Sequence, residues 1–141
     1  MAHKDILQRT ENFVTELLSN KLSPKLIYHN LNHTLNVVNN AQKIGKKSDL
    51  NEDELEIVTL AAWFHDTGYI DSYAGHEDRG KQIAEEFLKG NNYDPAKLAK
   101  VLTCIDATRM PQQPKNLMEQ VLCDADLLHL GQENFFDYSD M

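Results

Sequence analysis

The sequence contains few cysteines, no long apolar run and no excess of positive charge. Among its 141 residues are two cysteines, Cys104 and Cys123, and no CxxC pair, which excludes a zinc ribbon and a thioredoxin-like motif. No apolar stretch approaches the roughly 18 residues of a membrane span, and the N-terminal MAHKDILQRTENF lacks the apolar region of a signal peptide. We therefore expect a cytoplasmic protein without membrane contact, whose cysteines are core thiols.

The charge balance is acidic, with 14 Lys and Arg against 22 Asp and Glu and a formal net charge of −8. A protein that binds a nucleic-acid polymer usually carries a basic patch that neutralises phosphates. The sequence therefore predicts no nucleic-acid polymer as partner. A small phosphorylated substrate stays compatible with this charge, because a metal ion or a few local cations can offset the negative field.

The length of the chain is sufficient for one domain with a sizeable core, and we expect a single domain over residues 1–141. The C-terminal QENFFDYSDM is rich in aromatic residues, which need a surface to pack against. Either these side chains pack back onto the domain or the chain is a fragment of a longer protein. The sequence leaves the oligomeric state open.

Apolar residues recur with the helical period of 3.6 residues along almost the whole chain, and no segment has the pattern of a strand. The sequence therefore predicts an all-α fold. After a first helix that is broken at LSPK, the expected helices cover about residues 32–47, 52–66, 77–89, 95–107 and 115–130. The apolar face of the 32–47 helix consists of Leu35, Val38, Ala41 and Ile44.

The 52–66 helix starts in an acid-rich stretch that Ser48 or Asn51 can cap, and its second half, IVTLAAWF, is apolar on nearly all sides. His65 and Asp66 end this run. Neighbouring helical residues point about 100° apart, so their side chains reach one target only where the helix opens into a loop. A metal ion there would satisfy both, since a buried unpaired carboxylate is costly. Taken alone, the pair also fits a helix-ending histidine followed by a turn.

Two further stretches carry candidate ligands. YHNLNHT places His29 and His33 four residues apart, on one face if the stretch is helical, although it also fits a cap or turn before a helix. VLCDADLLHLG places Asp124 and Asp126 inside an apolar helix, where a solvated face fits badly. The two aspartates point about 200° apart, so only one can face the core, and the apolar residues of the helix lean slightly towards Asp124.

Together the three stretches supply imidazoles and carboxylates from three helices. A set of two histidines and two carboxylates suits a divalent ion such as manganese, iron, zinc, cobalt or magnesium. Fewer than six protein ligands leave positions for water and substrate oxygens, as is typical of catalytic sites.

The motifs YHNLNHT, WFHDTGY and CDADLLHLG, in this order over about residues 28–130, resemble the HD superfamily of metal-dependent phosphohydrolases. The His-Asp doublet alone is unspecific, but the ordered series within an all-helical pattern is typical of the superfamily. YHNLNH is also similar to the opening motif of its distant members, the cyclic-nucleotide phosphodiesterases. The resemblance implies a helical bundle with the metal in its centre. The residues that match the ligands are His33, His65, Asp66 and Asp126.

The resemblance also bears on the less certain positions. The Ala-Asp-x-Leu context selects Asp126 over Asp124, which becomes a candidate to orient a histidine ligand. Several binuclear relatives have a histidine where GHEDRG places His76, and another at the end of the next helix, where this chain has CIDATRM. This departure favours a single metal ion. We expect His76, Arg79 and Arg109 to contact substrate or phosphate, with helix capping for the histidine and a solvated face for the arginines as alternatives.

The reaction expected from these residues is metal-dependent hydrolysis of a phosphoester, in a nucleotide or a related small phosphorylated metabolite. Asp66 would ligate the metal and accept a proton from water, and His29 would protonate the leaving oxygen. Two alternatives remain open. One is a non-catalytic nucleotide-sensing module that keeps the metal as a structural element. The other is a di-iron oxygenase on the same scaffold, against which the missing second-metal ligands count.

Overall fold

The structure of the chain is a computed structural model, which describes residues 2–21, 24–70, 76–109 and 112–127. For residues 2–4, 21, 24–30, 69–70 and 76 it describes the backbone alone.

The described residues are almost entirely helical and contain no strand, which confirms the all-α prediction. The elements that follow one another are α1 (Ala2–Lys21), α2 (Pro24–Lys47), α3 (Glu52–Phe64), the 3-10 turn η1 (Thr67–Ile70), α4 (His76–Gly90) and α5 (Pro95–Ala107). A further helix covers residues 117–127. The predicted continuation of this helix to residue 130 and the aromatic C-terminal segment lie outside the described residues.

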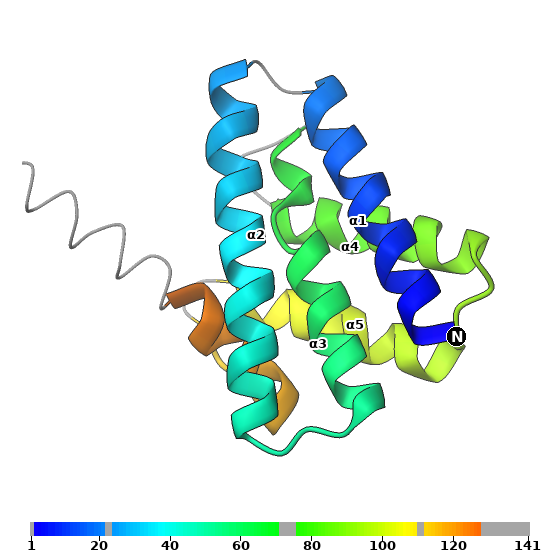
Figure 1. Cartoon of the computed structure of the whole chain (residues 1–141), viewed down its shortest axis with the longest axis vertical. Helices are drawn as coiled ribbons and strands as arrows, with labels where there is room; N and C mark the ends of the chain where they lie inside the picture. Colours follow the sequence, from blue (N-terminus) through cyan, green and yellow to red (C-terminus); the bar gives the residue numbers. More distant parts are fainter. Residues whose placement is uncertain (1, 22–23, 71–75, 110–111, 128–141) are drawn as a thin grey trace, which may run out of the picture.

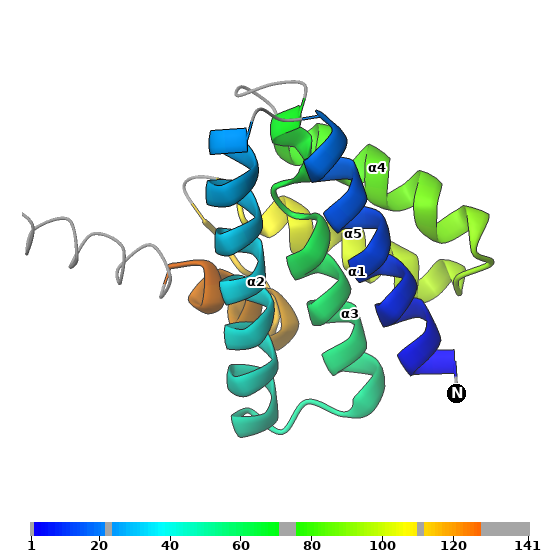
Figure 2. The same ribbon diagram turned by 45° about the horizontal axis from the view of Figure 1, so that its top comes forward.

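Helix α3 is the centre of the bundle. Figures 1 and 2 show α1, α2 and α3 side by side, with α4 and α5 crossing behind them and the 117–127 helix next to α2. Helix α3 contacts α1, α2, α4 and α5, and its residues 56–64 are all buried. The apolar run IVTLAAWF is therefore explained by neighbours on every side, as its lack of a polar face predicts.

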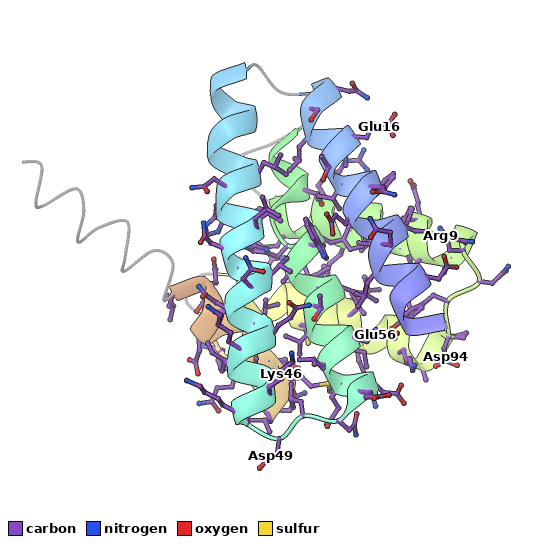
Figure 3. All side chains as sticks on the ribbon, in the orientation of Figure 1. Arg9, Glu16, Lys46, Asp49, Glu56 and Asp94 are labelled. Atoms are coloured by element: carbon purple, nitrogen blue, oxygen red, sulfur yellow. The ribbon has the colours of Figure 1, made fainter. Side chains whose placement is uncertain are left out.

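The start of α3 is fixed by a capping box. Asn51 Oδ1 accepts a hydrogen bond from the Glu54 N–H at 2.8 Å, and the Asn51 N–H donates to Glu54 Oε1 at 3.0 Å. Asn51, and not Ser48, is thus the cap. The preceding turn contains Asp49 with φ of 62°, a left-handed conformation that aspartate tolerates better than most residues. Figure 3 shows the Asp49 side chain projecting away from the bundle at this turn.

Helix α2 differs from the prediction in its start and at one position of its buried face. It begins at Pro24 rather than near residue 32, since proline suits the first turn of a helix and no breaker follows it. Leu35, predicted to face the core, is 41% exposed, whereas Val37 is fully buried. Val38 and Ala41 of the predicted face are buried and Ile44 packs against the core, so Leu35 is the one residue of the four that the core does not take up. Helix α3 also ends earlier than predicted, at Phe64, which leaves His65 and Asp66 in a turn.

Both cysteines are free and buried, as the sequence predicts. Burial raises the pKa of the Cys104 thiol to about 12 and that of Cys123 to about 11, so both thiols stay protonated near neutral pH. Among the helices described, none is long and apolar enough to cross a membrane.

Candidate metal centre

Four side chains that are far apart in the sequence meet beside the C-terminal end of α3. His33 comes from α2, His65 and Asp66 follow α3, and Asp126 comes from the 117–127 helix. His33 Nε2 lies 3.1 Å from both Asp66 Oδ2 and Asp126 Oδ1. His65 Nε2 lies 3.3 Å from Asp66 Oδ2 and 3.5 Å from Asp126 Oδ1. Two imidazoles and two carboxylates therefore share one small volume, the HD cluster.

A hydrogen bond to the backbone fixes the orientation of the His65 ring. Its Nδ1 donates a hydrogen bond to the Ala62 carbonyl at 2.7 Å, which places the lone pair of the neutral ring on Nε2. His65 is 1% exposed, and its Nε2 has no hydrogen-bond partner among the described residues. A buried nitrogen that faces two carboxylates without a hydrogen bond calls for a proton or a metal ion.

The carboxylates and histidines of the cluster also shift one another's pKa values. Burial alone would lower the pKa of His33, but its hydrogen bonds to Asp126 and Asp66 outweigh this effect and raise the pKa to about 9. Burial opposes the charged form of His65 as well, yet the two carboxylates raise its pKa well above the usual value. Burial would raise the pKa of Asp126, but the hydrogen bond with His33 and the close approach of His65 lower it far below its usual value. The carboxylates thus create a negative potential that attracts a cation.

The spacing of the donor atoms fits a shared ion. Two atoms that each lie about 2.1 Å from one ion are separated by about 3.0 Å at a right angle and about 3.4 Å at the tetrahedral angle. The four nitrogen–oxygen separations in the HD cluster are 3.1, 3.1, 3.3 and 3.5 Å. One donor atom each from His33, His65 and Asp66 lie within 4.8 Å of one another. His33, His65 and Asp66 can therefore hold one divalent metal ion, and Asp126 lies next to both histidines of this group. Mixed nitrogen and oxygen donors suit several metals.

Packing between aromatic residues positions the end of α3 that carries the doublet. Phe13 of α1 stacks on Phe87 of α4 with ring centroids 4.3 Å apart, and Phe64 lies against both rings. Phe64 directly precedes His65, so this contact places the cluster relative to α1 and α4.

Gly80 allows α4 to approach the doublet closely. A Cβ at this position would lie 2.9 Å from the Phe64 carbonyl oxygen and 3.5 Å from that of His65. The Thr67 hydroxyl donates to the same Phe64 carbonyl at 2.8 Å, which satisfies a carbonyl at the helix end. A side chain on Gly80 would press on backbone atoms rather than on a flexible group. A glycine inside a predicted helix is the sequence signal of such an approach.

The structure separates the two aspartates of CDAD. Asp126 is 8% exposed and contacts both histidines, whereas Asp124 is exposed. The motif context correctly indicated the aspartate that joins the cluster, whereas the position of the apolar residues on the helix favoured Asp124. The proposed orienting role of Asp124 is wrong for His65, because the Ala62 carbonyl occupies the Nδ1 of that ring.

Two predicted site residues are described only by their backbone. His29 lies in α2, four residues before His33, and His76 is the first residue of α4. Their side chains lie outside the described part of the structure. Arg79, one turn into α4, lies with Nη1 3.4 Å from Gln82 Oε1. The proton-donor role of His29 and the substrate roles of His76 and Arg79 stay predictions.

Arg109 lies on the wall of a groove of about 950 Å³ between α4, α5 and residues 113–119. Its Nη2 lies 2.6 Å from Asp78 Oδ1 and 3.2 Å from Asp106 Oδ1, and Lys81 pairs with the same two carboxylates. Hydrogen bonds from Arg109 lower the pKa of Asp78, and those from Lys81 lower the pKa of Asp106. Of the described residues that line this groove, none belongs to the HD cluster. A phosphate at Arg109 would have to compete with two carboxylates.

Sequence reasoning missed two contributors to the centre. The Ala62 carbonyl carries no signal in the sequence, because any residue supplies one. Gln112 lies in the connection after α5 and donates from Nε2 to Asp126 Oδ2 at 3.2 Å. Its position in RMPQQPK gave no periodicity from which to infer this contact.

Comparison with known proteins agrees with the geometry. No curated protein matches the sequence. A crystal structure of a predicted HD superfamily hydrolase from an uncultured Thermotogales bacterium has a similar fold, with a TM-score of 0.71 and 22% sequence identity. The match covers 90% of this chain and 74% of that one. The sequence matches the HD domain family over residues 30–131, which include all four residues of the HD cluster, and the chain therefore belongs to the HD-domain family.

Proposed function

We propose that the protein is a metal-dependent phosphohydrolase that cleaves a phosphoester in a small phosphorylated substrate, with nucleotides as the first class to test. The convergence of His33, His65, Asp66 and Asp126 within hydrogen-bonding distance, in a chain of the HD-domain family, supports this proposal. The family commonly consists of metal-dependent hydrolases. The acidic net charge and the buried, reduced cysteines are consistent with a cytoplasmic enzyme that does not act on nucleic-acid polymers.

The metal in this proposal is one divalent ion held by the four residues of the HD cluster. When bound, such an ion acidifies a water molecule and offsets the negative charge of a phosphate. His65, fixed by the Ala62 carbonyl, offers Nε2 in a single orientation. Asp126 offers Oδ1, since this atom faces both histidines. Two histidines and two carboxylates leave coordination positions for water and a substrate oxygen.

The proton transfers in the proposal are assigned to chain residues. The Asp66 side chain lies in the cluster and is 14% exposed, and in the proposal it accepts a proton from the attacking water. His29 precedes His33 by four residues in α2, so the two share one face of the helix. In the proposal, His29 delivers a proton to the departing oxygen.

The proposal is tested by phosphate release from a panel of nucleotides and simple phosphate esters. Protein loaded with manganese, iron, zinc, cobalt or magnesium is compared with chelated protein, and Asp126→Asn serves as the matched loss-of-site variant. Release that requires metal and is lost in Asp126→Asn supports the proposal. A protein that binds metal and nucleotide but releases no phosphate from any substrate would instead be a sensing module.

A further inference from the structure

The two carboxylate oxygens of Asp126 have different partners. Oδ1 lies 3.1 Å from His33 Nε2 and 3.5 Å from His65 Nε2. Oδ2 accepts a hydrogen bond from Gln112 Nε2 at 3.2 Å. One oxygen therefore faces the HD cluster, while a neutral side chain from another segment occupies the other.

The Gln112 amide is anchored at the end of α5. Its Nε2 also lies 3.5 Å from the Thr108 carbonyl oxygen. Thr108 is buried and is itself tied to α5, because its hydroxyl donates to the Ile105 carbonyl at 2.7 Å. The two N–H groups of the amide thus point to two acceptors, one on Asp126 and one on the backbone at the C-terminal end of α5. Gln112 links the end of α5 to the helix that carries Asp126.

The orientation of the amide follows from these acceptors. The reversed amide would place its oxygen against a carboxylate and a carbonyl, which both repel it. In the observed orientation Gln112 Oε1 is buried and accepts no hydrogen bond from the described residues. An unpaired buried acceptor is costly, so the hydrogen bonding of the loop by itself does not account for the position of the Gln112 side chain.

We infer that Gln112 is a positioning residue for the metal centre, which holds Asp126 so that only Oδ1 is offered to the ion. This inference rests on the proposed metal site and deepens it. A carboxylate with both oxygens free can occupy two coordination positions, whereas one oxygen held by an amide leaves the second position for water or substrate. An amide suits this role because it carries no charge, so Asp126 keeps its full negative charge towards the ion, which a lysine or arginine at the same place would offset.

The test uses Gln112→Met, which keeps the length of the side chain and removes the N–H donors. The matched control is Gln113→Met, because Gln113 is the adjacent residue and is exposed on the 950 Å³ groove. Metal affinity and the visible absorption spectrum of the cobalt-loaded protein are measured for both variants, together with the melting temperature of the metal-free forms. Gln112→Ala provides a second variant if the methionine disturbs folding.

We expect Gln112→Met to bind metal about 10- to 100-fold more weakly, as for other residues that orient a ligand, and to change the cobalt spectrum. Gln113→Met should match the wild type in both. Wild-type affinity and spectrum in Gln112→Met would overturn the inference, as would a lower melting temperature of the metal-free variant with an unchanged spectrum. If Gln112→Met shows the expected loss but the wild type hydrolyses no phosphoester, the inference stands and the proposed phosphohydrolase activity fails.

Discussion

His33 Nε2 and Asp126 Oδ1 lie 3.1 Å apart although 93 residues separate them in the chain. This contact joins α2 to the 117–127 helix and completes a cluster whose other two members follow α3. The HD cluster therefore exists only in the folded chain, which makes metal binding and folding interdependent.

Removal of the metal should lower the melting temperature. An ion that binds only the folded arrangement stabilises it by about 2.7 kcal/mol at 100 times its dissociation constant, enough for a shift of several degrees. Thermal unfolding is recorded before and after chelation and after metal is restored. A chelated protein that melts at the same temperature and takes up no ion on titration would contradict the metal assignment.

The two aspartates of CDAD should behave differently. Asp126→Ala removes a buried group that contacts both histidines and should abolish high-affinity metal binding. Asp124→Ala changes an exposed residue and should alter the free energy of unfolding by no more than about 0.5 kcal/mol, with metal affinity retained. Calorimetric metal titration of both variants measures the difference. The opposite ranking would assign the ligand to Asp124.

The stability of the metal-free protein should fall as the pH rises from about 6.5 to 9. The folded-state pKa of His33 is raised to about 9, above its ordinary value of 6.5. A raised pKa contributes stability that is fully present below the unfolded value and is lost as the pH rises through the folded value. Metal affinity should increase over the same interval, because the proton leaves the nitrogen that binds the ion. Unfolding curves across this range, with and without metal, measure both effects. A flat profile for the metal-free protein would show that His33 is not protonated in the cluster.

Gly80→Ala should disturb the metal centre, whereas Gly90→Ala in the same helix should not. The new Cβ at position 80 would lie 2.9 Å from the Phe64 carbonyl oxygen, next to the doublet, while a Cβ at position 90 meets nothing within 4 Å. We expect Gly80→Ala to lose about 1–3 kcal/mol of stability, as overpacked sites do, and to bind metal more weakly. Gly90→Ala should be neutral or up to about 1 kcal/mol more stable. Chemical unfolding measures the stability of both variants, and metal titration measures their metal affinity. Equal effects of the two substitutions would mean that close packing at Gly80 does not position the doublet.

Replacement of His29 should slow hydrolysis selectively. If its imidazole donates a proton to the leaving oxygen, His29→Asn should reduce the rate on a substrate with a poor leaving group by about 10²- to 10⁴-fold, the usual contribution of general acid–base catalysis. An activated aryl phosphate needs little protonation and should lose much less. The variant should keep its metal and melting temperature. Equal losses on the two substrates would exclude the acid role, and loss of metal would indicate a structural one.

Much of the site was predictable because it depends on residue type and local order. Three short-range features of the sequence were informative. The capping pattern at Asn51 marks the start of α3, the apolar run before His65 is buried, and the sequence context of Asp126 identifies the aspartate that joins the cluster. The start of α2 was less predictable, since the segment between Pro24 and residue 32 contains no breaker and no strong apolar stripe. The buried face of α2 was predictable at Val38, Ala41 and Ile44, whereas Leu35 at the edge of that face is exposed and Val37 is buried in its place.

The sequence by itself determined the all-α fold, the membership in the HD-domain family and the four residues that meet in the cluster, because periodicity and motif order are local properties of the chain. Only the tertiary structure decided how these side chains are held. The Ala62 carbonyl that orients His65, the approach of α4 at Gly80 and the hydrogen bond from Gln112 to Asp126 depend on how segments pack in space. Such contacts use backbone atoms, a missing side chain and a loop amide, none of which leaves a periodic signal in the sequence.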